Sequence, residues 1–184
     1  MKSLTLIPLV ALLSGCFVTA GVQKEPPMVV RHGAAPSLAI VIFSKQAGFA
    51  ATTQNSLGKC LEQRNVFTLI DSKKVEQAVD NEKINLDRVY GLDDAEYKKI
   101  AADVGAEYVL FGNLAEVKSL KFTGWRKDIY SLFYLHNGKD GKKVDSWRSD
   151  TTLTFADAKT ELERDKMLSS VISHTCAKIA DEFK

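Results

Sequence analysis

Continuous apolar runs and helical periods alternate along the first half of the chain. Residues 38–43, L-A-I-V-I-F, have the length and the uninterrupted apolar character of a strand buried on both faces. Apolar positions at helical spacing follow up to about Arg64, and a second buried strand is predicted at residues 66–70. Asp71 or Ser72 is placed to cap a further helix. The order strand, helix, strand predicts a right-handed parallel crossover.

A third helix and the strongest strand pattern lie in the middle of the chain. Asp93 or Asp94 is placed to begin this helix, whose apolar positions repeat every three or four residues, and Gly105 is placed to end it. The following strand, A-E-Y-V-L-F-G-N-L at residues 106–114, is predicted to lie at the centre of the sheet. Gly112 within it indicates either a bulge or a helix packed closely above.

The second half of the chain is rich in strand pattern and ends in a helix. Strands are predicted at about residues 129–135 and 144–155, and the segment between them, N-G-K-D-G-K-K, carries two strong hairpin-turn pairs. Residues 162–183 place their apolar side chains on one helical face. We therefore predict an α/β fold, in which a mixed sheet has a parallel β-α-β first half and an antiparallel meander second half. Helices pack on the sheet, and a C-terminal helix closes the domain.

The N-terminal segment has the pattern of a secretory signal. Lys2 supplies a positive start, and the apolar run at residues 4–13 is shorter than the about 20 residues that span a bilayer. The letters L-S-G-C, which end at Cys16, resemble the bacterial lipobox, whose cysteine becomes the lipid-modified first residue of the mature protein. The alternative is an ordinary signal peptide in which Cys16 is one more apolar residue. Phe17 stands where an aspartate would signal inner-membrane retention, which favours a periplasm-facing anchor in the outer membrane.

These patterns divide the chain into a signal peptide at residues 1–15, a lipidated tether at 16–37 and a single domain at 38–184. Three of the four prolines lie in the tether, which argues against long regular structure there. The chain has 25 Lys and Arg residues against 23 Asp and Glu residues, so its charge does not indicate a nucleic-acid partner. Hydrophobic residues make up 45% of the sequence, as in ordinary globular proteins with a packed core.

The cysteines that remain after lipidation indicate one structural hypothesis. Cys60 and Cys176 lie on the apolar faces of two predicted helices, in a protein expected in an oxidising compartment. A disulfide would tie the first helix to the last. Two buried free thiols, which behave as small hydrophobic groups, are the alternative.

No catalytic pattern is found in the sequence. No two of the histidines, His32, His136 and His174, have the spacing of metal ligands, and nucleophile-elbow, phosphate-loop and zinc-protease motifs are missing from the sequence. Asp93 and Asp94 are adjacent, which indicates a helix start rather than a converging catalytic pair. We predict that the protein is not an enzyme and requires neither a cofactor nor a metal.

One segment combines basic and aromatic residues in what the pattern predicts to be a connection. Tryptophan and arginine are frequent anchors at protein interfaces, and the candidate partner surface has four members: Phe122, Trp125, Arg126 and Lys127. The alternative is that Phe122 and Trp125 only cover one end of the sheet. The basic hairpin tip, with Lys139, Lys142 and Lys143, is typical of a solvated turn.

Three stretches taken together resemble a known family. They are F-T-L-I-D at residues 67–71, I-A-A-D-V-G-A-E-Y-V-L-F-G-N-L at 100–114, and a glycine hairpin with Trp147 in its return strand. They are similar to the periplasmic domain shared by the curli secretion lipoprotein CsgG, the penicillin-binding-protein activator LpoB and related small lipoproteins. The resemblance covers about residues 38–155 and rests on core motifs, so it supports fold better than function. It implies an α/β sandwich that binds other proteins and has no known chemistry of its own.

The resemblance leaves more than one function open. We expect a non-catalytic, lipid-anchored adaptor in envelope assembly, transport or secretion, bound to the membrane through Cys16 and to an unidentified envelope protein, with a homo-oligomer as a further option. The first alternative is an LpoB-like activator of a penicillin-binding protein, although this tether extends no more than roughly 70 Å. The second is a subunit of an oligomeric secretion complex without membrane hairpins of its own, because the segment before residue 129 is short and charged.

Overall fold

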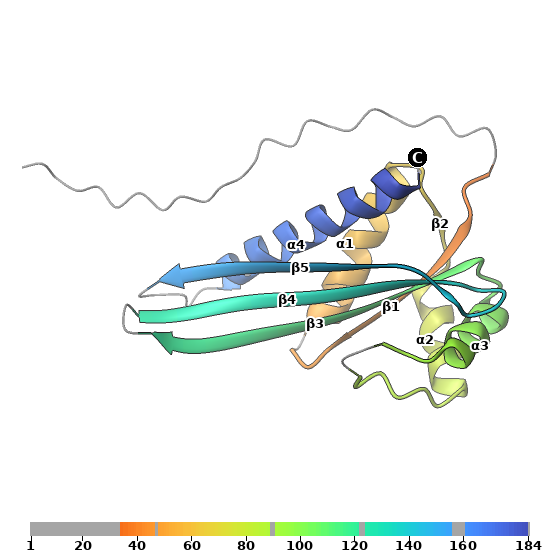
Figure 1. The fold of residues 1–184 in the computed structure, drawn as a ribbon, viewed down its shortest axis with the longest axis horizontal. Coiled ribbons are helices and arrows are strands. Elements are labelled where there is room, and N and C mark those ends of the chain that lie inside the picture. Colours follow the sequence, from red (N-terminus) through yellow and green to blue (C-terminus); the bar gives the residue numbers. More distant parts are fainter. Residues whose placement is uncertain (1–33, 47, 89–90, 122–123, 156–160, 184) are drawn as a thin grey trace, which may run out of the picture.

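A mixed sheet with helices on both faces forms the core of the protein (Figure 1). The computed structural model describes residues 34–46, 48–88, 91–121, 124–155 and 161–183. Within them β1 pairs in parallel with β2 and β3, β4 and β5 continue antiparallel, and the strand order is β2-β1-β3-β4-β5. The predicted α/β fold, with β3 at its centre and a closing helix, is therefore confirmed. The elements are β1 (Ser37–Ser44), α1 (Phe49–Gln63), β2 (Thr68–Leu69), α2 (Ser72–Asn81), α3 (Asp94–Val104), β3 (Tyr108–Lys121), β4 (Gly124–Asn137), β5 (Lys143–Phe155) and α4 (Glu161–Glu182).

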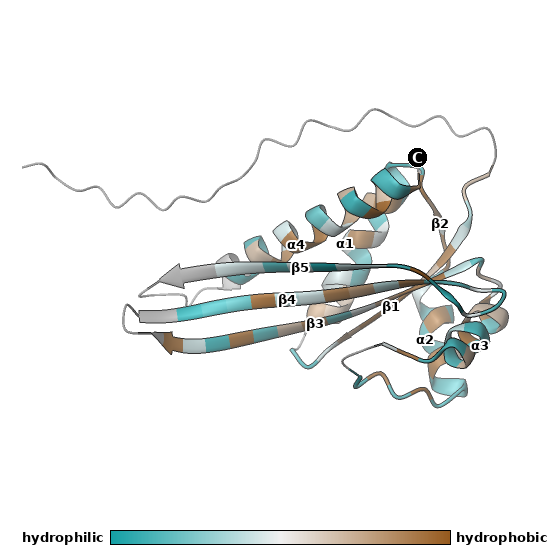
Figure 2. Cartoon of the chain, viewed as in Figure 1, coloured by the Kyte–Doolittle hydropathy of each residue, from teal (hydrophilic) through white to brown (hydrophobic). Residues whose placement is uncertain are grey.

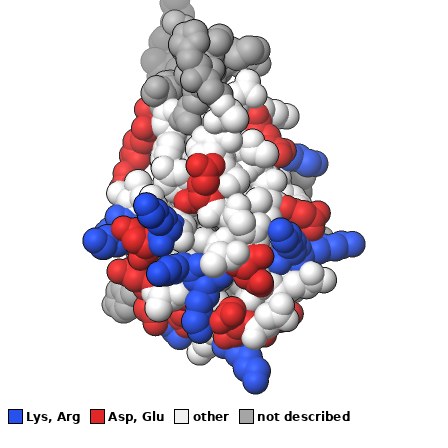
Figure 3. Space-filling model, turned by 90° about the vertical axis from the view of Figure 1, so that its right-hand side faces the viewer, with Lys and Arg blue, Asp and Glu red and all other residues white. Residues whose placement is uncertain are grey.

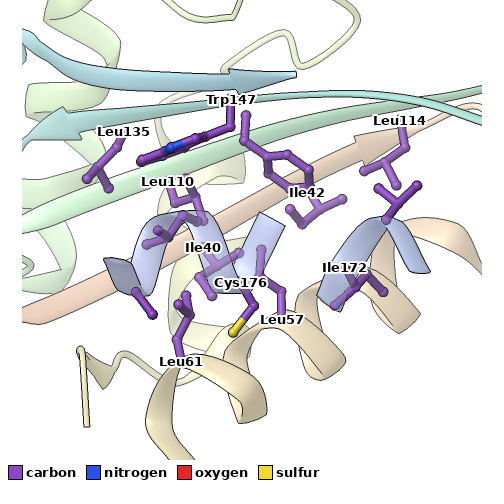
Figure 4. Close-up of a cluster of buried hydrophobic side chains, with 14 of the residues drawn as sticks. Ile40, Ile42, Leu57, Leu61, Leu110, Leu114, Leu135, Trp147, Ile172 and Cys176 are labelled. Carbon is purple, nitrogen blue, oxygen red and sulfur yellow. The ribbon is translucent and has the colours of Figure 1, made fainter. Parts of the chain in front are cut away.

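The sheet separates two hydrophobic clusters, because successive side chains of a strand point to opposite faces. One face packs against α1 and α4, where residues such as Leu110, Leu135 and Trp147 are buried (Figure 4). The other face packs against α2 and α3 and buries Phe111 and Tyr97. In Figure 2 apolar residues are frequent where β1, β3 and β4 run beside one another, β5 is largely hydrophilic, and the helices carry both apolar and polar residues. None of the described helices combines the length and the apolar character that crossing a membrane requires.

Local capping signals set the ends of α2 and α3 as the sequence predicts. The Asp71 carboxylate accepts hydrogen bonds from the backbone of the first turn of α2. Asp93 and Glu96 form a reciprocal capping box at the start of α3. Gly105 ends α3 with a φ of 72°, in the left-handed region that glycine adopts without a Cβ penalty.

Two local predictions in the sheet are wrong. Only Thr68 and Leu69 form β2, instead of residues 66–70, because the backbone N–H of Val66 bonds to Leu61 at the end of α1. Gly112 marks neither a bulge nor a close helix, since the ladder through it is unbroken. A Cβ at Gly112 would lie 2.6 Å from the Phe133 ring, so the glycine makes room for the phenylalanine of the neighbouring strand.

The turn between β4 and β5 packs against α3. A Cβ on Gly138 would lie 2.4 Å from the carbonyl oxygen of Ala106. Gly141 has a φ of 74°, and a Cβ there would overlap the backbone carbonyl of Asp94 at the start of α3. The turn predicted from the two glycine pairs therefore packs against α3 instead of projecting freely into solvent. Its exposed residues include Lys139 and Lys142.

A disulfide joins the two helices on one face of the sheet. Cys60 of α1 and Cys176 of α4 have an S–S distance of 2.03 Å and a Cα–Cα distance of 6.3 Å. Cys176 is fully buried in the cluster beneath these helices (Figure 4). Of the two arrangements considered for these cysteines, the structure has the disulfide. The predicted signal peptide and most of the predicted tether, Cys16 included, lie outside the described residues.

Candidate partner surface

Three strands continue past the end of β1 and form an arm. The last residue pair between β1 and β3 is Ser44 with Leu114, whereas β3 runs on to Lys121 and pairs with β4 throughout. We call residues 115–121, 124–130 and 150–155 the arm, which extends to the left in Figure 1. The segment predicted as a connection is therefore strand, and that prediction is wrong. Charged residues interrupt its apolar alternation and hide the strand pattern.

One face of the arm points away from α1 and α4, and we call it the outer arm face. It is defined by ladder position, since facing residues of paired strands share one side of a sheet. Val117 lies opposite Asp128 and Thr152, and Ala115 lies opposite Tyr130 and Asp150. Val117 is 44% exposed on this face. The outer arm face consists of Ala115, Val117, Arg126, Asp128, Tyr130, Asp150 and Thr152.

A hydrogen-bonded network holds Arg126 on the outer arm face. Its Nε donates to both carboxylate oxygens of Asp128 at 2.8 Å, and a terminal nitrogen donates to Thr152 Oγ1 at 3.2 Å. Thr152 in turn donates to Asp128. The hydrogen bonds that Arg126 donates to the Asp128 carboxylate, and the charge of that carboxylate, raise the pKa of Arg126. The Arg126 side chain is 39% exposed and that of Asp128 only 6%, so a positioned guanidinium faces solvent over a buried carboxylate.

Lys127 does not belong to an exposed surface, which corrects the sequence prediction for this residue. Its side chain is 7% exposed and lies on the opposite side of the arm from Arg126, because neighbouring strand residues alternate. Its Nζ lies 4.0 Å from Glu116 Oε1, and Lys118 Nζ lies 3.3 Å from the same oxygen. Lys127 is therefore a covered ion-pair partner of Glu116 rather than an exposed group for binding another protein.

The aromatic members of the predicted surface are placed only in part. Phe122 lies outside the described residues. The backbone of Trp125 lies in β4, opposite Leu120 of β3 and Phe155 of β5. Leu120 is 67% exposed near the tip of the arm. Sequence reasoning missed Asp128 and Thr152. Asp128 lies two residues from Arg126 on β4, so strand alternation places both on one face, whereas Thr152 of β5 meets Arg126 only through the strand register.

The histidines occupy unrelated positions. His136 of β4 is buried, its ring stacks on Tyr97 with centroids 3.5 Å apart, and its Nδ1–H donates to the Gly141 carbonyl oxygen at 2.6 Å. His174 is exposed on α4, and His32 lies outside the described residues. Among the residues that the structure describes, no three His, Cys, Asp or Glu side chains gather as metal ligands would.

Burial of His136 predicts a pH dependence of stability. Desolvation lowers the pKa of its imidazole, and the positive charge of Lys143 lowers it further. The hydrogen bond to Gly141 and the negative charge of Asp94 raise the pKa, but the net shift is downward. The unfolded chain then binds the proton at higher pH than the folded chain, so the free energy of unfolding falls as pH drops through 6.5. Urea titrations between neutral and mildly acidic pH measure this slope.

The control for this pH dependence is a pair of histidine variants. His136→Gln removes the titrating group and is expected to flatten the profile in that range. His174→Gln changes an exposed histidine of α4 and should keep the wild-type profile. An unchanged slope in His136→Gln would contradict the assignment.

The end of the molecule remote from the arm tip has mixed charge. Figure 3 views this end, where Lys and Arg side chains are interspersed with Asp and Glu side chains. This matches the near balance of 25 basic and 23 acidic residues in the sequence. Of the large apolar side chains that are exposed among the described residues, Val117 and Leu120 lie in the arm, and Val144 lies near the start of β5.

Comparisons with known proteins indicate a fold. No protein-family model matches the chain, and no curated protein sequence matches it. The structure is similar to lipoprotein GNA1162 from Neisseria meningitidis, with a TM-score of 0.54 and 14% identity over 79% of this chain and 99% of that one. Protein CT253 from Chlamydia trachomatis gives a TM-score of 0.52 and 9% identity over 79% of this chain and 98% of that one. At such identities the similarity establishes a shared fold alone.

The LpoB C-terminal domain from Salmonella enterica also matches, at 18% identity over 64% of this chain and 83% of that domain. Its TM-score of 0.42 is too low to support an argument. The fold is thus shared with a bacterial lipoprotein, and the CsgG part of the sequence resemblance stays a prediction.

Proposed function

We propose that this chain is a lipid-anchored, protein-binding adaptor of the bacterial envelope. It is held at the outer membrane through Cys16, and its outer arm face binds an envelope protein in the periplasm. The observation that carries the proposal is the outer arm face, where Val117 is 44% exposed, one same-face ladder position away from Arg126, on strands that pair continuously. An exposed apolar side chain beside a positioned arginine has the composition of an interface centre.

The proposed role is non-catalytic because the residues that most often perform catalysis have structural tasks here. His136 donates to the backbone of the β4–β5 turn, and Asp93 caps α3. Asp128 holds Arg126 in place. These side chains are occupied in different parts of the fold, which favours binding over chemistry as the function.

Anchoring through Cys16 is supported by the lipobox-like sequence and by the fold shared with a protein described as a lipoprotein. The segment from Cys16 to Ser37 reaches roughly 70 Å when fully extended. Its mean span as a flexible coil is nearer 25 Å. The partner is therefore expected close to the membrane that holds the lipid.

The second candidate function is activation of a penicillin-binding protein, which the sequence resemblance to LpoB favours. It requires the synthase to come within the reach of this tether. Both functions use the same arm, so the identity of the bound protein separates them.

Photo-crosslinking from the arm tests the proposal. A photoreactive amino acid at Val117, in the full lipidated chain in cells, is expected to capture a defined envelope protein that mass spectrometry identifies. The matched control is the same amino acid at Lys139, an exposed position on the β4–β5 turn. Recovery of a penicillin-binding protein would select the activator role, and secretion or transport components would select the adaptor role. Equal capture from both positions would contradict a binding role for the arm.

Cys16→Ser tests the anchor separately. The variant is expected to lose labelling by radioactive palmitate and to move from the membrane fraction to the soluble fraction, because multiple acyl chains are needed for stable anchoring. The domain should keep its thermal unfolding midpoint. Crosslinking from Val117 should fall because the protein is no longer held near its partner. Unchanged fractionation would refute lipidation at this cysteine.

A further inference from the structure

The outer edge of β5 is available for strand pairing. Among the described residues β5 pairs with β4 only, and it forms one border of the sheet over 13 residues (Figure 1). It contains neither proline nor glycine, and the only irregularity of its ladder lies near its start, at Leu135 and His136 of β4. A long regular edge of this kind is a template for adding another strand.

A hydrogen bond between the Ser131 side chain and the backbone of Ser149 indicates which backbone groups of β5 face the free edge. Ser131 Oγ donates to the Ser149 carbonyl oxygen at 3.0 Å, so that carbonyl points toward β4. Backbone groups alternate in direction along an antiparallel strand, which directs those of Arg148 and Asp150 toward the free edge. The backbone N–H of Ser146, two residues earlier, accordingly donates to the side chain of Asp145.

Arg148 and Asp150 also carry opposite charges at the same edge. Both are exposed, and both lie on the sheet face opposite to Trp147 and Ser149, which point toward α4. No ion pair within 4.0 Å joins either residue to another residue of the described ranges. Two opposite charges separated by one residue on a free edge are complementary to an antiparallel copy of the same strand.

We propose that two copies of this chain pair through β5 about a two-fold axis at Ser149. In this register Arg148 faces Asp150 of the second copy, and Asp150 faces its Arg148. Ser146 faces Thr152 on either side. The facing pairs provide about six backbone hydrogen bonds, because the Ser146 N–H of each copy already donates to Asp145. Residues directly opposite share one face, so α4 of both copies lies on the same side of a continuous sheet.

The charges select this register among the neighbouring ones. Moving the axis by one residue, to Arg148 or to Asp150, places that charged residue opposite itself. Moving it by two residues, to Trp147 or Thr151, leaves both charges opposite uncharged residues. Like charges directly opposite destabilise a strand pair, whereas opposite charges stabilise it. A two-fold contact is isologous, so each favourable pair occurs twice and the assembly closes as a dimer.

Charge reversal tests the proposal in the full-length lipidated chain, kept in detergent excess, with mass measured by native mass spectrometry. The wild type is expected to be a dimer at micromolar concentration. R148D and D150R should each raise the dimer dissociation constant about tenfold or more, because each places like charges opposite one another twice. The double variant R148D/D150R should dimerise again. An equimolar mixture of the two single variants should form the mixed dimer, since the charges are then complementary.

The matched control is Lys139→Glu, which reverses a charge on the exposed β4–β5 turn and should leave the dimer unchanged. A mixture of R148C and D150C should form an intermolecular disulfide between the two variants. The Cα atoms of directly opposite residues in an antiparallel pair lie within the range of distances that a disulfide can bridge. A monomeric wild type at these concentrations would overturn the proposal, as would a dimer that both single variants leave intact. Circular dichroism of each variant establishes that a lost dimer is not a lost fold.

Discussion

Gly141→Ala is expected to lower the free energy of unfolding by about 2–5 kcal/mol. The residue has a φ of 74°, where a Cβ costs about 1–2 kcal/mol. The Cβ would also overlap the Asp94 carbonyl, so the turn would have to move away from α3. That movement would disturb the Gly141 carbonyl, which accepts the hydrogen bond from buried His136. Urea denaturation followed by tryptophan fluorescence measures the loss.

Gly105→Ala is the matched control for this prediction. Gly105 has a similar φ of 72°, but a Cβ there would have no atom within 4 Å. The control therefore reports only the backbone cost, about 1–2 kcal/mol, and the excess in Gly141→Ala measures the contact between turn and helix. Equal losses in the two variants would show that the turn does not pack closely on α3.

Removal of the Cys60–Cys176 disulfide is expected to cost about 4 kcal/mol, within the usual range of about 2–5 kcal/mol. The bond links residues 116 positions apart, and closing so long a loop removes much conformational freedom from the unfolded chain. It also joins α1 to α4 over the larger hydrophobic cluster. The variant is Cys60→Ala with Cys176→Ala, compared with the oxidised wild type by urea denaturation.

Chemical reduction provides the internal control for the disulfide. A reducing agent should destabilise the wild type by a similar amount and leave the double variant unchanged. Peptide mapping without reduction should recover the two cysteines in one linked fragment. Recovery of two free thiols from the intact protein would contradict the bond.

The sequence specifies most of the fold through signals that act over a few residues. Asp71, Asp93 and Gly105 set helix ends through their own side chains or backbone freedom, so they are visible without the structure. The central strand is equally clear, because its apolar run is continuous. The shortness of β2 is not visible, because it depends on how α1 ends at Leu61 and Val66.

The candidate surface is harder to predict because its residues meet through strand register. The local composition around Trp125 and Arg126 draws attention to the correct segment. It does not reveal that the segment is a hairpin, and strand alternation then places Lys127 and Arg126 on opposite sides. Asp128 lies two residues from Arg126, and the two share a face only because the segment is a strand. Distance along the chain hides the contact with Thr152, since β5 returns to β4 only after the turn between them.

The place of β1 in the sheet has a mechanical consequence for an anchored protein. β1 begins at Ser37, which exchanges hydrogen bonds with Glu107 at the end of the sheet opposite the arm tip, and it runs parallel to β3. A pull between a lipid at the N-terminus and a partner on the arm would draw β1 and β3 along each other in opposite directions. Such a shear force acts on all the hydrogen bonds between the two strands together, instead of opening them one by one. In a chain anchored through Cys16 as proposed above, the pairing of β1 with β3 would therefore bear this load.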